Sequence, residues 1–192
     1  MHGKENTPVL IALGANLPFA GEGPQATLAA AIVALVEEGF QVPKVSRFYA
    51  TPCFPAGAGP DYVNAAARII AGPEVDAASI MQRLHAVEAR FGRERTQRWG
   101  MRTLDIDLLA VGDSVLPDAA TLDRWRNLAP DAQLRAEPDR VILPHPRLQD
   151  RSFVLVPLAD VAPRWVHPRT GLTVRQMLKA LPAADRDAVK PL

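Results

Sequence analysis

Apolar positions in the first half of the chain recur at two spacings, which together predict alternating strands and helices. A short apolar run over 9–13 ends at Gly14-Ala-Asn16, which is typical of a buried strand that enters a turn. Over 24–38 the apolar residues follow a helical spacing, and Gly39 supplies a stop. Strand-forming residues then extend over 41–51, and a loop rich in proline and glycine follows over 52–60.

The pattern repeats in the next fifty residues. A strand is predicted over 61–71, and a helix over 74–91, where Ile80, Leu84, Val87 and Phe91 form one apolar stripe. A polar loop over 93–102 leads into an alternating strand over 103–111. The order β-α-β-β-α-β predicts an α+β fold with a ferredoxin-like core, in which an antiparallel sheet carries its helices on one face.

The remaining residues are weaker in pattern and are expected to extend this core as one domain over 1–192. Residues 114–140 are rich in Asp, Pro, Arg and Ala, and we treat them as an inserted segment with one short helix. Short helices are predicted over 152–161 and 173–181, forming a C-terminal extension. The tail from Pro182 is expected to be loose.

The amino-acid composition excludes several classes of protein. Of the 192 residues, 48% are hydrophobic, so a sizeable core is expected. The net charge is only +1, so the protein has no overall positive electrostatic field that would attract nucleic acid or an anionic membrane. A single cysteine, Cys53, excludes an intramolecular disulfide and a cysteine zinc site, and we interpret it as inert. No apolar run approaches the ~20 residues of a membrane span, and no signal peptide is evident. A soluble, cytoplasmic protein is expected.

The predicted strand over 103–111 carries the first candidate chemistry. Alternation places Leu104, Ile106 and Leu108 on the core face, and Asp105 and Asp107 together on the other, about 7 Å apart. Two such carboxylates are suited to Mg²⁺, which prefers oxygen ligands and keeps substrate phosphates and water. Solvated charges on an open sheet face are the alternative interpretation.

A basic loop runs directly into this acidic strand. Between 90 and 102 there is one acid, Glu94, and five arginines: Arg90, Arg93, Arg95, Arg98 and Arg102. Arginine forks bind phosphate oxygens, and carboxylates with arginines are the parts of phosphoryl-transfer sites. Alternatively, Arg90 and Arg93 are placed where a helix ends, because the helix dipole favours cations at its C-terminus. This alternative explains the positions of the other arginines less well.

Other motifs are less specific. The chain has neither a Walker loop nor a Gly-x-Gly-x-x-Gly sequence. His145 lies between two prolines and precedes Arg147 and Arg151, so it is either a structural histidine or a group that reaches an anionic ligand.

Residues 98–109 resemble the signature Arg-Trp-Gly-Pro-Arg-Thr-Leu-Asp-Leu-Asp of the 6-hydroxymethyl-7,8-dihydropterin pyrophosphokinase family. Further segments match it in order, at 12–16, 48–52, 61–64 and 143–148, followed by Arg151 and Phe153. The resemblance covers most of the chain, from Val9 to about Pro163. It implies a ferredoxin-like enzyme of folate biosynthesis that transfers the diphosphoryl group of ATP to the pterin hydroxymethyl oxygen and leaves AMP.

The resemblance also implies roles for individual residues. Asp105 and Asp107 match the ligands of two Mg²⁺ ions, and Arg93, Arg95, Arg102 and Asp107 are the catalytic candidates. The residues matching the ATP site are Glu88, Arg95, Trp99, Arg102, His145 and Arg151. The residues matching the pterin pocket are Thr51, Pro52, Phe54, Tyr62, Asn64 and Phe153. Neighbouring enzymes of folate synthesis are possible partners.

The chain departs from the family pattern at three places. Met101 replaces the usual proline, so the turn into the strand is less rigid. Ala50 stands where an arginine is common, and the segment 114–140 is longer than in compact members. That segment is expected to cap the site, contact a partner, or have no role.

Two other classes of protein remain as alternatives. A ferredoxin-like RNA-binding or regulatory module would bind a ligand without forming AMP, although an RNA-binding sheet face would carry aromatic and basic residues rather than two aspartates. An enzyme that transfers a single phosphoryl group would form ADP.

Overall fold

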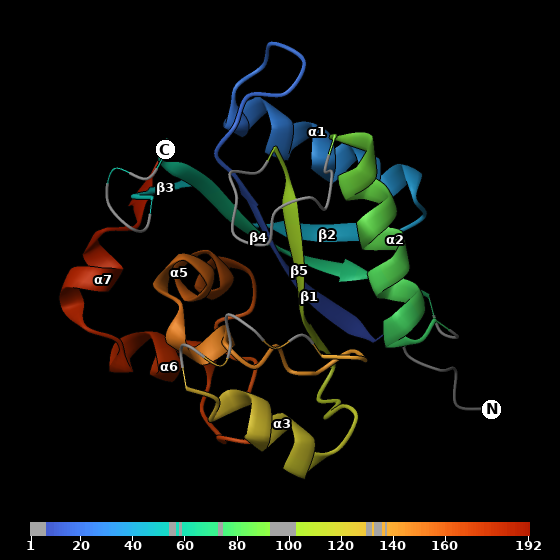
Figure 1. Cartoon of the computed structure of the whole chain (residues 1–192), viewed down its shortest axis with the longest axis vertical. Coiled ribbons are helices and arrows are strands. Elements are labelled where there is room, and N and C mark those ends of the chain that lie inside the picture. The colour runs from blue at the N-terminus through green and yellow to red at the C-terminus, as the bar shows by residue number, and fades with distance from the viewer. Residues whose placement is uncertain are drawn as a thin grey trace.

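An antiparallel sheet of six strands is the centre of the molecule (Figure 1). The computed structural model describes residues 7–53, 57, 59–72, 75–92, 103–129, 132, 136 and 138–192. The strand order is β5-β1-β4-β3-β6, and β2 pairs with the far part of β4. The strands are β1 (Pro8–Ala15), β2 (Gln41–Val45), β3 (Tyr49–Thr51), β4 (Tyr62–Ile70), β5 (Asp105–Val111) and β6 (Lys190–Pro191).

The helices of the repeated β-α-β unit cover one face of this sheet. Helices α1 (Pro24–Glu37) and α2 (Ala77–Arg90) pack on alternate residues of β1, including Val9, Ile11 and Leu13, to form the larger hydrophobic core. Helix α2 begins where Asp76 accepts a hydrogen bond from the Ser79 N–H, at 2.7 Å. The order of the core strands and helices is the predicted ferredoxin-like arrangement.

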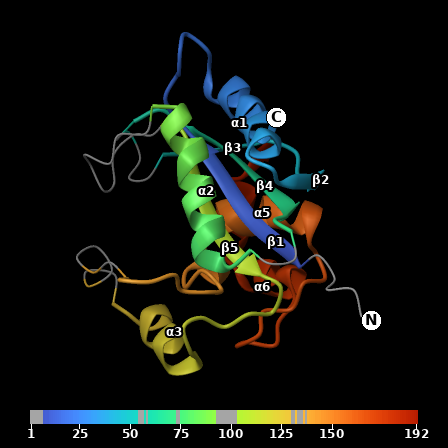
Figure 2. The same ribbon diagram turned by 90° about the vertical axis from the view of Figure 1, so that its right-hand side faces the viewer.

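The C-terminal extension covers part of the other face. Helices α5 (Ser152–Val161) and α6 (Val174–Ala180) enclose a second core with Leu10, Ala12 and Ala66 of the sheet. The alanines allow the helices to approach the sheet closely. Figure 2 shows α2 on the opposite side of the strands from α5 and α6.

Two segments differ in detail from the sequence prediction. The strand expected over 41–51 is divided into β2 and β3, and at the break the Ser46 hydroxyl accepts the Ala66 N–H at 2.9 Å. The tail from Pro182, expected to be loose, contains α7 (Ala183–Asp187) and the short strand β6, which pairs with β3.

The inserted segment contains the helix α3 (Ala119–Arg126), which Asp118 caps by accepting the Thr121 N–H at 2.8 Å. The chain then returns to the sheet through a short 3₁₀ turn, η1 (Leu148–Asp150). Across the described ranges, no helix has the length and apolar character to cross a membrane.

Candidate active site

A row of four residues crosses the sheet on the face opposite α1 and α2. The pairing register aligns Tyr49 of β3, Asn64 of β4, Gly14 of β1 and Asp105 of β5. Neighbouring strands lie ~4.8 Å apart, so two spacings place the backbones of Asn64 and Asp105 about 10 Å apart. Gly14 between them has no side chain, and the Asn64 Oδ1 would lie only 3.0 Å from a Cβ at that position, so the glycine makes room for the amide beside the carboxylate strand.

The two aspartates of β5 occupy the positions that the alternation predicts. Ile106 and Leu108 are buried in the core beneath α2, while Asp105 and Asp107 face the other side and are half-buried. Asp107 lies opposite Ala12, and Asp105 opposite Gly14. Small neighbours on β1 therefore leave both carboxylates accessible from one side.

Helix α2 fixes the backbone between these aspartates. The buried Glu88 accepts a hydrogen bond from the Ile106 N–H, at 2.6 Å. The Thr103 hydroxyl donates to the Phe91 carbonyl at 2.6 Å, which joins the end of α2 to the start of β5. The structure thus places Glu88 as a support for the aspartate strand, although sequence resemblance had suggested only a position lining the ATP site.

The N-terminal end of α5 brings a cation and an aromatic ring to the aspartates. Arg151 immediately precedes the helix, and its Nη1 lies 3.6 Å from Asp107 Oδ2. The same guanidinium lies 5.7 Å from the centre of the Phe153 ring. Phe153 is 40% exposed, which leaves part of this ring available to a planar ligand at the mouth of the site.

His145 is held along the outer edge of β5 by its backbone and one ring nitrogen. Its N–H donates to the Leu109 carbonyl at 2.8 Å, and its Nδ1 accepts the Arg147 N–H at 3.1 Å. Burial, followed by the charge of Arg151, lowers the pKa of His145 to about 3, against an opposing effect of Asp105. The imidazole is therefore neutral at physiological pH. With Nδ1 accepting, its proton lies on Nε2, so it is a hydrogen-bond donor.

The opposite end of the row carries the candidate pterin residues. Asn64 is buried, and its amide donates to the Thr51 hydroxyl at 2.6 Å. Thr51 lies opposite Tyr62 in the β3–β4 pair, and Pro52 follows it as an exposed residue. The bond between Thr51 and Asn64 sets the orientation of the amide, because a carboxamide held on one side presents its oxygen on the other.

Two positions in this region were not among the predicted site residues. Gly14 is one, since a Cβ there would lie 3.0 Å from the Asn64 Oδ1. Asn16 is the other: it is buried, and its amide donates to the Pro60 carbonyl at 3.2 Å, which ties β1 to the loop before β4. The Gly-Ala-Asn sequence was a turn signal and part of the family resemblance, but neither pattern indicated these contacts.

Five predicted site residues lie outside the described part of the chain: Phe54, Arg93, Arg95, Trp99 and Arg102. The structure brings the remaining ones to one face and one end of the sheet, except Glu88, which approaches β5 from α2. A carboxylate pair beside an arginine is the arrangement that phosphoryl-transfer enzymes use. Fold and site therefore define a candidate phosphotransferase of the α+β class.

Comparison with known proteins identifies the particular family. Residues 10–163 match the 7,8-dihydro-6-hydroxymethylpterin-pyrophosphokinase (HPPK) family, and the chain belongs to it. A Synechocystis protein named 2-amino-4-hydroxy-6-hydroxymethyldihydropteridine pyrophosphokinase is 35% identical, over 95% of this chain and 79% of its own length. A Haemophilus influenzae protein of the same name is 30% identical, over 94% of this chain and 95% of its own.

The fold is found in solved structures as well. The crystal structure of wild-type Plasmodium falciparum HPPK-DHPS matches 93% of this chain with a TM-score of 0.61 and 13% identity, and this chain spans 45% of that longer one. These comparisons confirm the predicted family, the ferredoxin-like fold and a pyrophosphokinase activity in folate biosynthesis. As a kinase-type transferase, the enzyme uses ATP.

Proposed function

We propose that the row from Asn64 to Asp105 is the site at which the diphosphoryl group of ATP passes to 6-hydroxymethyl-7,8-dihydropterin. The hydroxymethyl oxygen forms a bond to the β-phosphorus and loses its proton. The bond from that phosphorus to the α,β-bridging oxygen breaks, and AMP leaves with this oxygen. The observation that carries the proposal is this cross-strand row, which has an amide oriented by Thr51 at one end and two carboxylates at the other.

Asp105 and Asp107 fit a hard cation. Both are half-buried on one strand face, and Mg²⁺ is held in phosphate-transfer sites by one or two carboxylates together with substrate phosphates and water. No group of three or more His, Cys, Asp or Glu side chains suited to a metal occurs in the described ranges. We assign these aspartates to two Mg²⁺ ions, which would offset the charge of the triphosphate.

The residues around the aspartates are assigned to the nucleotide. Arg151, held beside Asp107, offers a guanidinium to phosphate oxygens, and neutral His145 offers a hydrogen bond without adding charge. Glu88 keeps the strand in position from behind. Roles for Arg93, Arg95, Trp99 and Arg102 stay predictions from the resemblance, with Arg95 expected to act mainly in the transition state.

The other end of the row is assigned to the pterin ring. Asn64 would hydrogen-bond the ring, Thr51 holds the Asn64 amide, and Phe153 supplies an aromatic wall. Tyr62 borders the same end of β4, and Pro52 and Phe54 complete the predicted pocket. A flat ring rich in donors and acceptors is matched by aromatic walls with a few placed polar groups.

Positioning and electrostatics account for the chemistry that these residues perform. Phosphoryl transfer needs no covalent intermediate when the reactants are held in line and the developing charge is neutralised. We assign no general base, and the proton of the hydroxymethyl group passes to water in this scheme. Association with other folate enzymes and a cytoplasmic location stay predictions.

The test of the metal assignment is the Mg²⁺ dependence of Asp107→Asn. We expect turnover to fall at least about 100-fold, because even groups that only support a metal ligand contribute 10–100-fold. Asp113→Asn, an exposed aspartate beyond the end of β5, is the matched control and should behave as wild type. Normal turnover and Mg²⁺ dependence in Asp107→Asn would contradict the assignment.

A further inference from the structure

A pocket outside the proposed active site lies in the inserted segment. It has a volume of about 340 Å³ and is lined by Pro117, Thr121, Arg124, Trp125, Asp139 and Arg140. Figure 1 shows α3 beyond the end of β5 that leads away from Asp105. The volume is within the ~300–1,000 Å³ range of small-molecule sites, and none of its lining residues belongs to the proposed active site.

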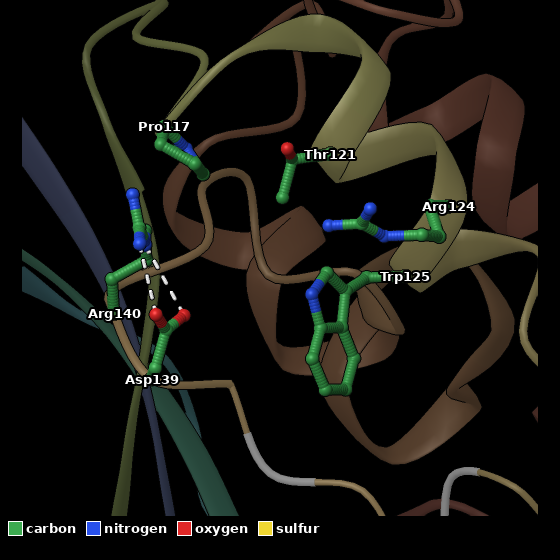
Figure 3. Close-up of a pocket in the computed structure, with 6 residues that line it drawn as sticks. All are labelled: Pro117, Thr121, Arg124, Trp125, Asp139 and Arg140. Atoms are coloured by element: carbon green, nitrogen blue, oxygen red, sulfur yellow. Dashed lines mark hydrogen bonds and ion pairs between the residues drawn. The ribbon is translucent and has the colours of Figure 1, made fainter.

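The walls of this pocket come from two parts of the chain. In Figure 3, Thr121 and Arg124 point from α3 into the pocket, and the Trp125 ring lies below the guanidinium of Arg124. The opposite wall is formed by Asp139 and Arg140. The half-buried Trp125 therefore provides an aromatic surface next to a cationic group.

The two arginines of the lining differ in how their hydrogen-bond donors are used. Arg140 is paired with Asp139 through Nη2 at 2.8 Å and Nε at 3.1 Å. Arg124, by contrast, forms no hydrogen bond and no ion pair within 4 Å among the residues that the structure describes. Its charge interacts only at longer range with the carboxylates of Asp118 and Asp139. The pocket thus contains one guanidinium whose hydrogen-bond donors are not used by the described residues.

The helix that carries Arg124 is firmly attached. Leu122 on α3 is fully buried, and Asp123 forms ion pairs with Arg126, at 3.4 Å, and with Arg169. Asp118 caps the first turn. Because α3 is anchored on its other faces, its pocket face is held in place before any ligand arrives, which lowers the entropic cost of binding.

We propose that this pocket binds a small planar aromatic molecule bearing one carboxylate or phosphate group. The ring would lie against Trp125, and the anionic group would accept two parallel hydrogen bonds from Arg124. The Asp139–Arg140 pair bounds the far side without adding net charge. The proposal is independent of the reaction assigned to the active site.

The test follows the Trp125 indole N–H resonance during titration with benzoate, phenyl phosphate and the neutral benzamide. The chain has three tryptophans, and Trp125→Phe assigns the signal. We expect a saturable shift with at least one of the two anions, and their relative affinities distinguish a carboxylate site from a phosphate site. Benzamide should bind at least about tenfold more weakly, because it lacks the charge that Arg124 recognises.

Arg124→Gln separates specific recognition from general attraction. This exposed side chain forms no hydrogen bond or close ion pair with the described residues, so the variant should fold and should lose at least about tenfold in affinity for the anion. Arg175→Gln removes the same charge from an exposed position on α6 and should bind as wild type. No saturable shift with either anion, equal binding of benzamide, or unchanged affinity in Arg124→Gln would overturn the proposal.

Discussion

At the scale of single residues, the absence of a side chain at Gly14 is as important as the groups around it. The residue lies between Asn64 and Asp105 in the cross-strand row. Its role depends on three strands pairing in one register, so the sequence showed a turn signal and not the close approach of Asn64 to Gly14. The two aspartates were predictable because strand alternation is a local property.

Gly14→Ala should weaken pterin binding while leaving the fold intact. The new Cβ would lie 3.0 Å from Asn64 Oδ1, so the amide must shift away from the position that Thr51 gives it. Loss of one hydrogen bond contributes about 1 kcal/mol, and we expect the pterin dissociation constant to rise roughly five- to tenfold. Calorimetric titration measures this directly.

Gly23→Ala is the control for this substitution, since no atom lies within 4 Å of a Cβ there and its φ of −74° suits alanine. Equal pterin affinity in Gly14→Ala and wild type would show that the part of the row next to Gly14 is not the pterin site.

At the scale of elements, the strongest apolar stripes were predicted well and the short strands were not. The helix expected over 74–91 exists as α2, and it begins at Ala77 because Asp76 provides the cap. The strand expected over 41–51 is interrupted, since Ser46 there bonds the backbone of β4 by a contact that no local pattern reveals.

The contact between α2 and β5 gives a prediction about Glu88. Glu88→Ala should leave the buried Ile106 N–H without this acceptor and destabilise the protein by about 1–3 kcal/mol. Glu88→Gln keeps an acceptor oxygen and should restore much of this stability. Urea unfolding of both variants measures the difference.

The same pair of variants tests whether α2 positions the aspartates. If it does, the apparent Mg²⁺ affinity should fall in Glu88→Ala and recover in part in Glu88→Gln. Stability close to wild type in Glu88→Ala would contradict the structural role of this carboxylate.

At the scale of the whole molecule, contacts between distant segments were the least predictable feature. Strand β6 has only two residues, yet it pairs with β3 at the edge of the sheet. Arg47 and Tyr49 also converge on Asp160 of α5, with the Tyr49 hydroxyl donating at 2.7 Å. Both contacts depend on the path of the C-terminal extension, on which sequence spacing carries no information.

The attachment of α3 predicts a dependence of stability on pH. His167 is fully buried beside Arg126 and Arg169, and its Nδ1 accepts the Arg169 N–H at 3.1 Å. Burial, followed by the charge of Arg126, lowers the pKa of His167 to about 4. The unfolded chain therefore binds a proton first, and stability falls as pH decreases from about 6.5 towards 4.

His167→Asn retains an acceptor for the Arg169 N–H and removes this titration. We expect the free energy of unfolding of this variant to fall less steeply than that of wild type between about pH 6.5 and pH 4. The difference in slope corresponds to at most one proton, or about 1.4 kcal/mol per pH unit. Chemical unfolding across this range measures the slope. An identical slope in wild type and His167→Asn would show that His167 is not held neutral.

The most direct test of the central claim is the identity of the nucleotide product. The purified chain is incubated with ATP, Mg²⁺ and 6-hydroxymethyl-7,8-dihydropterin, and the nucleotides are separated. The account predicts that AMP forms only when the pterin is present, in equal amount to the pterin diphosphate, and that Asp107→Asn forms neither. ADP as the product, or AMP formed equally without the pterin, would contradict transfer of a diphosphoryl group at this site.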